Sequence, residues 1–217
     1  MPGGKMVTHA YIISRAGDFE RQRWAIDQAD QLGVGYRFFP AMQPDGVRWG
    51  ALNTRVRGMR KNGAFGCLLS HYHVLQDALL NGTGALIFED DLLPMPGFAF
   101  DFTDLPPADM YFFGWITWGA EAKVTPVTEN WHKRDNFAGT HCYYVPYERI
   151  QRVLAWYEKS KWDLQVDNLL ATDQGAISLL FKTGPRVLQN TELGTTIGNR
   201  AHQSDVEFAK PFLHKHF

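Results

Sequence analysis

The stretch GALIFEDDLLP, from Gly84 to Pro94, joins an apolar run directly to three carboxylates. Ala85 to Phe88 are all apolar, and a short apolar run between turn residues is typical of a buried strand. Glu89, Asp90 and Asp91 follow the run and repel one another. In open α/β sheets, ligands bind just outside the carboxyl ends of the strands. The three charges therefore either face water or lie where a positively charged group binds.

The composition indicates one globular domain. A chain of 217 residues is long enough for a single α/β domain with a sizeable core. Its 45% apolar content is ordinary, and 21% charged residues argue against disorder. The 22 Lys and Arg nearly balance the 23 Asp and Glu, so no overall basic field favours nucleic-acid binding.

Cysteine content and hydropathy indicate the compartment. Cys67 and Cys142 are the two cysteines, and their spacing is not that of a metal or disulfide framework. We expect two small, buried thiols in a reducing compartment. The sequence has neither a signal-peptide apolar segment nor a run of ~18 apolar residues that would span a membrane. We therefore expect a cytoplasmic protein.

Strands and helices alternate in the first half of the chain. The apolar patterns predict strands at residues 9–14, 36–42, 85–88, 108–115, 141–145 and 186–189. They predict helices at residues 25–32, 68–79, 146–157 and 174–181. This alternation is typical of the α/β class, with a twisted, mainly parallel central sheet flanked by helices. We expect one domain over 1–217, with a core at about 9–190 and a C-terminal tail at 191–217.

The acidic strand end has the residue types of a metal site. Glu89 and Asp91 lie on the same strand face if the strand geometry continues to Asp91. Carboxylate oxygens are the ligands that Mg²⁺ and Mn²⁺ prefer. A solvated turn has the same spacing, and the spacing alone does not decide between the two.

The segment GCLLSHYHVLQDAL…ALIFEDDLLP resembles the central signature of glycosyltransferase family 25, the lipooligosaccharide-type galactosyltransferases. That pattern runs from Gly-Cys through Ser-His and a helix to an apolar strand ending in Glu-Asp-Asp. The resemblance covers the chain from about Tyr11 to Gln189. Ala64 departs from it, since the family often has an acidic residue there. Other segments match in order: YIISRAGDFERQRW, FFPAMQPDG, GTHCYYVPYERIQRVL, QVDNLL and PRVLQN.

The resemblance implies a GT-A-like fold and an inverting transfer from a UDP-sugar, with UDP-galactose favoured. It also implies a Mn²⁺ or Mg²⁺ ion, which Glu89 and Asp91 would hold. Such an ion stabilises the charge that develops on the leaving diphosphate. The donor side that it implies consists of Ser14, Arg21, Ala41, Ser70, His71 and Asp90.

Inversion also needs a base that takes the proton of the acceptor hydroxyl. Asp167 in QVDNLL corresponds to a Pro-Val-Asp position of the family, and we expect it to be this base, with Asp163 as the alternative. Without the resemblance, Asp167 would be interpreted as a residue that caps or solvates a helix start.

The implied acceptor is a glycan or lipid-linked glycan, such as lipooligosaccharide, with at most peripheral membrane contact. The basic loop residues that could make such a contact are Arg55, Arg57, Arg60 and Lys61. His202, His214 and His216 are candidates for a further metal ligand, and the sequence does not choose among them.

Two other functions stay open. A metal-dependent nucleotidyltransferase also uses carboxylates at strand ends, although SRAGDFERQR is a poor match to a phosphate-binding loop. A non-catalytic protein that binds nucleotide-sugars or carbohydrates would bind the donor without turnover, and the departure at Ala64 keeps this alternative open. The sequence leaves the acceptor, the linkage and the oligomeric state undetermined.

Overall fold

The computed structural model describes residues 9–42, 63–103, 105–116, 122–160, 165–184 and 186–193. The helices in this part of the chain are α1 (Phe19–Gln31), α3 (Ala64–Leu80), α4 (Tyr147–Lys159) and α5 (Val166–Thr172), with a 3₁₀ turn, η2, at Thr191–Leu193. The strands are β1 (Ala10–Ser14), β2 (Tyr36–Pro40), β3 (Ala85–Glu89), β4 (Leu92–Pro94), β5 (Met110–Ile116), β6 (Val124–Pro126), β7 (Trp131–Arg134), β8 (Ala138–Val145), β9 (Leu179–Lys182) and β10 (Val187–Gln189).

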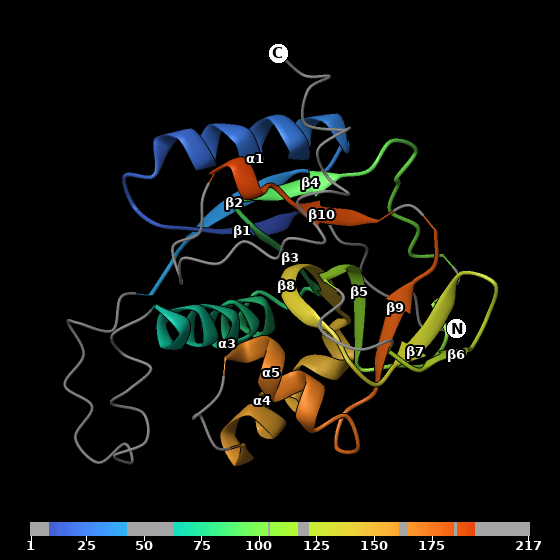
Figure 1. The fold of residues 1–217 in the computed structure, drawn as a ribbon. Coiled ribbons are helices and arrows are strands. Elements are labelled where there is room, and N and C mark those ends of the chain that lie inside the picture. Colours follow the sequence, from blue (N-terminus) through green and yellow to red (C-terminus); the bar gives the residue numbers. More distant parts are fainter. Residues whose placement is uncertain are drawn as a thin grey trace.

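The strands form one mixed sheet in the order β2-β1-β3-β8-β5-β9-β7-β6, and β10 pairs with β4 and β5 (Figure 1). The expected α/β class is confirmed. Parallel pairing joins β1 to β2 and β3, and joins β5 to β9 and β10. The β8 strand runs antiparallel to both β3 and β5. This strand therefore links the two parallel groups, which the alternation of elements did not predict.

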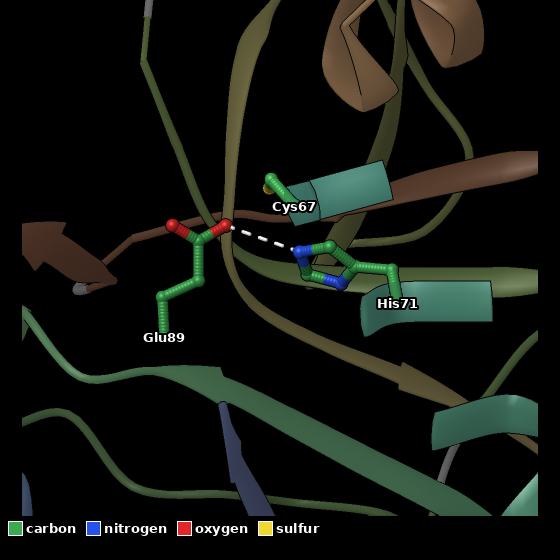
Figure 2. A group of neighbouring side chains, drawn as sticks. All are labelled: Cys67, His71 and Glu89. Atoms are coloured by element: carbon green, nitrogen blue, oxygen red, sulfur yellow. Dashed lines mark ion pairs between the residues drawn. The ribbon is translucent and has the colours of Figure 1, made fainter. Parts of the chain in front are cut away.

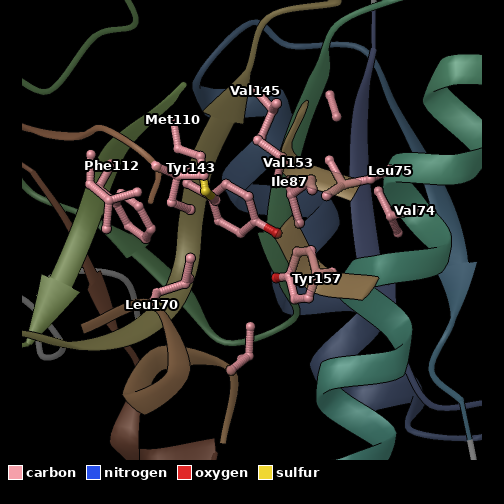
Figure 3. Close-up of a cluster of buried hydrophobic side chains, with 14 of the residues drawn as sticks. Val74, Leu75, Ile87, Met110, Phe112, Tyr143, Val145, Val153, Tyr157 and Leu170 are labelled. Atoms are coloured by element: carbon pink, nitrogen blue, oxygen red, sulfur yellow. The ribbon is translucent and has the colours of Figure 1, made fainter. Parts of the chain in front are cut away.

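The sheet is covered on both faces, which explains why the opening strand is apolar at every position. Ala85 and Ile87 of β3 pack into a core with α3, α4 and α5, which Figure 3 shows around Tyr143. Leu86 and Phe88 pack into a second core on the side of α1. A strand that is buried on both faces is expected to be a continuous apolar run rather than an alternating one.

The end of the chain differs from the expected elements. The predicted helix at 174–181 is wrong, because Leu179–Lys182 forms β9 and pairs in parallel with β5. Leu179, Leu180 and Phe181 are buried, and so short an apolar run does not distinguish a strand from a buried helix. The short strands β4, β6 and β7 were not predicted.

Several expected features lie outside the described residues, namely the basic loop, the C-terminal histidines and Asp163. The single-domain boundaries stay a prediction. Among the residues that the structure describes, none of the helices combines the length and hydropathy that a membrane span requires.

Candidate functional site

The first turns of α3 bring polar side chains to the carboxyl end of the parallel strands. The Oγ atom of Ser70 donates to the carbonyl of Gly66 at 2.7 Å and accepts from the amide of Met42 at 2.8 Å. Just before Met42, the amide of Ala41 donates to the carbonyl of Ser14 at 2.8 Å. Hydrogen bonds at residues 41 and 42 therefore bring together three of the expected donor-side residues, Ser14, Ala41 and Ser70.

Glu89, the last residue of β3, faces α3 (Figure 2). Its Oε1 atom lies 3.3 Å from Nε2 of the fully buried His71 and accepts a hydrogen bond of 2.6 Å from Oγ1 of Thr140. The other ring nitrogen of His71, Nδ1, lies 2.8 Å from the hydroxyl of Tyr143. Burial alone would raise the pKa of Glu89. The opposing effects of His71 and Thr140 are larger together and lower this pKa to about 2.

Cys67 joins this pair from the same helix (Figure 2). Cys67 and His71 are four residues apart, so their side chains lie on the same side of α3, one turn from each other. One potential metal ligand atom from each of Cys67, His71 and Glu89 lies within 4.8 Å of the others. Burial raises the pKa of the Cys67 thiol well above its usual value, and the nearby carboxylates raise it further.

Asp90 and Asp91 point away from this group, toward α1. The β3 strand ends at Glu89, so the strand alternation that would align Asp91 with Glu89 does not continue. Arg21 of α1 lies 2.6 Å from Oδ1 of Asp90 and 2.8 Å from Oδ2 of Asp91. Both carboxylates are buried, so they do not form a solvated turn.

Asp91 has one oxygen paired and one without a partner. Its Oδ2 atom accepts from Arg21 and, at 2.8 Å, from Nε2 of Gln189. Its Oδ1 atom is buried and has no hydrogen-bond partner among the described residues. Burial and the charge of Glu89 raise the pKa of Asp91 to about 6, although Arg21 and Gln189 oppose that shift. The metal role expected for Asp91 stays a prediction.

Asp167 is held at the start of α5. Its Oδ2 atom accepts from the backbone amide of Gly139 at 3.0 Å, and its Oδ1 atom accepts from the amide of Asn168 at 2.8 Å. Gly139 directly precedes Thr140, which donates to Glu89, so Asp167 lies on the β8 side of the α3 group. Asp167 therefore lies in the first turn of α5, and its role as the base stays a prediction.

Thr140 and Tyr143 both contact His71 although they are three residues apart on β8. In a regular strand, residues at that spacing lie on opposite faces. The pairing of β8 with β5 contains register shifts between Cys142 and Ala138, and such irregularities redirect side chains. Neither residue was predicted as part of the site, because the sequence gives no direct signal for this irregularity.

Together these features define an α/β protein with a polar site at the carboxyl end of a central strand, which α1, α3, α5 and β8 surround. Residues 7–99 of the chain match the sequence model of glycosyltransferase family 25, described as LPS biosynthesis protein. The resemblance expected from the sequence is thereby confirmed for this part of the chain. It contains Arg21, His71 and the three carboxylates, whereas Asp167 lies beyond it.

A relative is similar to this chain over a stretch of comparable length. The protein from Aedes aegypti named "Glycosyltransferase 25 family member" is 30% identical over 112 residues. That alignment covers 45% of this chain and 18% of the mosquito protein. The chain therefore corresponds to less than a fifth of that relative.

Proposed function

We propose that this protein is a glycosyltransferase that transfers a hexose from a UDP-sugar, with UDP-galactose favoured, to a glycan acceptor. The observation that carries the proposal is that the family match at 7–99 contains the acidic end of β3 and the residues that surround it. The mixed α/β sheet is compatible with a GT-A-like arrangement. The acceptor class is a glycan or lipid-linked glycan, reached from the cytoplasm with at most peripheral membrane contact.

The residues at the strand end are suited to a divalent cation of the Mn²⁺ or Mg²⁺ type. The buried Oδ1 atom of Asp91 has no partner among the described residues, and Glu89, two residues earlier, carries its carboxylate at the end of β3. Glu89 and Asp91 would hold the ion. When bound, it would neutralise charge on the leaving diphosphate.

Arg21 would fix the donor side of the site. Its guanidinium contacts both Asp90 and Asp91, so these carboxylates keep one orientation relative to α1. A preformed arrangement of charges needs little reorganisation when charge develops during the reaction. Arg21 therefore acts on the donor by positioning the two carboxylates.

Asp167 would act as the base. In an inverting transfer the acceptor oxygen bonds to the anomeric carbon while the bond from that carbon to the diphosphate oxygen breaks. The acceptor hydroxyl loses its proton, which Asp167 would accept. Backbone amides that donate to both carboxylate oxygens hold Asp167 in one orientation.

The decisive experiment is a thermal-shift titration with UDP-, GDP- and CMP-sugars, in the presence of Mn²⁺ and of a chelator. A ligand at 100 times its Kd stabilises the native state by about 2.7 kcal/mol. We expect UDP-galactose to raise Tm most, and more strongly with Mn²⁺. Glu89→Gln should weaken the Mn²⁺-dependent part, whereas Glu129→Gln, an exposed matched control, should not.

Two results would replace the proposal. If GDP- or CMP-sugars bind and UDP-sugars do not, the UDP-hexose donor is excluded. If UDP-galactose binds but no UDP is released with any glycan acceptor, the protein is a non-catalytic binding protein.

A further inference from the structure

We infer that Cys67, His71 and Glu89 form a binding site for a thiolate-binding divalent transition-metal ion of the Zn²⁺ class. This inference goes beyond the proposed function: the site shares Glu89 with the Mn²⁺ or Mg²⁺ site proposed above, but it has other further ligands and takes a different ion. Binding of the ion is a separate property that can be measured without a sugar.

The positions of the three side chains are suited to one ion (Figure 2). Two nitrogen or oxygen ligands at about 2.0–2.1 Å from a tetrahedral ion lie roughly 3.3 Å apart. The Nε2 atom of His71 and the Oε1 atom of Glu89 are 3.3 Å apart. Cys67, one helical turn before His71, brings its Sγ atom within 4.8 Å of both. Only a small movement of the cysteine side chain is needed to close the site.

The groups behind the ligands are those that orient metal ligands in proteins. A metal-bound histidine usually donates its other ring N–H to a nearby acceptor, which fixes the ring orientation. The hydroxyl of Tyr143 lies 2.8 Å from Nδ1 of His71 and can accept that hydrogen bond. The lone pair of Nε2 then faces Glu89, whose carboxylate is itself oriented by Thr140. A cation between the two side chains would bind to this lone pair and to the charge of the carboxylate.

The ligand types select the class of metal. Thiolate and imidazole favour Zn²⁺ and similar ions, whereas Mg²⁺ prefers oxygen ligands and keeps several waters. Binding converts the Cys67 thiol into a thiolate, and the released proton passes to solvent. The charge of the ion offsets the cost of burying that thiolate.

The test is a titration of the purified full chain with Co²⁺, which substitutes for Zn²⁺ and gives a thiolate-to-cobalt charge-transfer absorption in the near ultraviolet. We expect this absorption in the wild type, its removal by Zn²⁺, and no effect of Mg²⁺ at the same concentration. Cys67→Ser should abolish it. Cys142→Ser is the matched control and should retain it, because Cys142 lies in the core on the side of α1.

Further variants test the geometry. Tyr143→Phe and Thr140→Val should each weaken Co²⁺ binding by about 10–100-fold, as the loss of a ligand-orienting group does. Asp91→Asn should leave the absorption unchanged. Circular dichroism of each variant shows whether it is folded. If Cys67→Ser does not fold, Glu89→Gln is a second variant that removes a metal ligand.

The outcomes separate this inference from the proposed function. If the folded wild type gives no charge-transfer absorption, or the Cys67→Ser variant retains it, the metal site is overturned even where UDP-galactose binds and reacts. If the absorption depends on Cys67 but UDP-sugars do not bind, the metal site stands and the proposed function fails.

Discussion

The Nη2 atom of Arg21 lies 2.8 Å from the Oδ2 atom of Asp91, and both side chains are nearly withdrawn from water, at 11% and 4% exposed. The pair joins α1 to the segment that follows β3. A buried charge is tolerated where it is paired and hydrogen-bonded, and removing one partner leaves the other uncompensated. The acidic strand end is therefore neutralised in part by the protein itself.

Arg21→Ala should lower the free energy of unfolding by about 3–5 kcal/mol, because it leaves Asp90 and Asp91 buried without their cation. Urea denaturation measures the change. Arg23→Ala, an exposed position on the same helix, should stay within about 0.5 kcal/mol of the wild type. Equal stability of the two variants would contradict a structural role for the Arg21 pairs.

Gly114→Ala should destabilise the fold by about 1–3 kcal/mol, the usual cost of overpacking a core. An added Cβ at Gly114 would lie 2.6 Å from the ring of His141, which is buried and donates from Nε2 to the carbonyl of Val187. Gly175→Ala is the control, since nothing lies within 4 Å of a Cβ there. A thermal melt that ranks Gly175→Ala as the less stable variant would show that this packing is misjudged.

Stability should fall as the pH falls from 6.5 toward 4, in part through His132. Burial lowers the pKa of His132 from 6.5 to about 4, and the nearby charges of Arg134 and Arg186 act in the same direction. Between these values the unfolded chain binds a proton that the native chain does not, so acid favours unfolding. Burial lowers the pKa of His141 as well, so part of the pH dependence persists without His132.

His132→Gln tests this contribution, because glutamine does not titrate. The free energy of unfolding, measured by urea denaturation at several pH values, should depend less on pH in the variant than in the wild type between pH 6.5 and 4. An unchanged dependence in His132→Gln would show that His132 is protonated in the native state.

Much of the fold could be predicted, because the strongest patterns come from burial. The apolar run before Glu89 is buried on both faces, and the helical stripe of Leu68 and Leu75 packs into the core. The antiparallel insertion of β8 could not be predicted, because strand order depends on contacts between distant segments. The run at Leu179–Lys182 was misassigned because its burial does not distinguish a strand from a helix.

Part of the candidate site was predicted through the family resemblance. His71 and Glu89 were found through the central signature, and Arg21 through the matching segment YIISRAGDFERQRW. The partner of Asp91 was not, because Arg21 precedes it by 70 residues and only the fold brings the two together. Cys67 was interpreted as a small buried residue just before the predicted helix at 68–79. In the structure the helix begins at Ala64, so Cys67 lies one turn before His71.

Asp167→Asn should lower the rate of UDP release from UDP-galactose by roughly 10²–10⁴-fold, the usual contribution of a positioned base. The amide oxygen can still accept from the amide of Gly139, so the start of α5 and the thermal stability should stay near the wild type. Asp173→Asn is the control, since Asp173 follows the same helix but accepts from Nε1 of Trp156 at 2.6 Å. Donor binding, followed by the thermal shift with UDP-galactose, should be unchanged in both variants, which separates a lost base from a lost donor site. Wild-type turnover in Asp167→Asn would assign the proton transfer to another acid, with Asp163 the next to test.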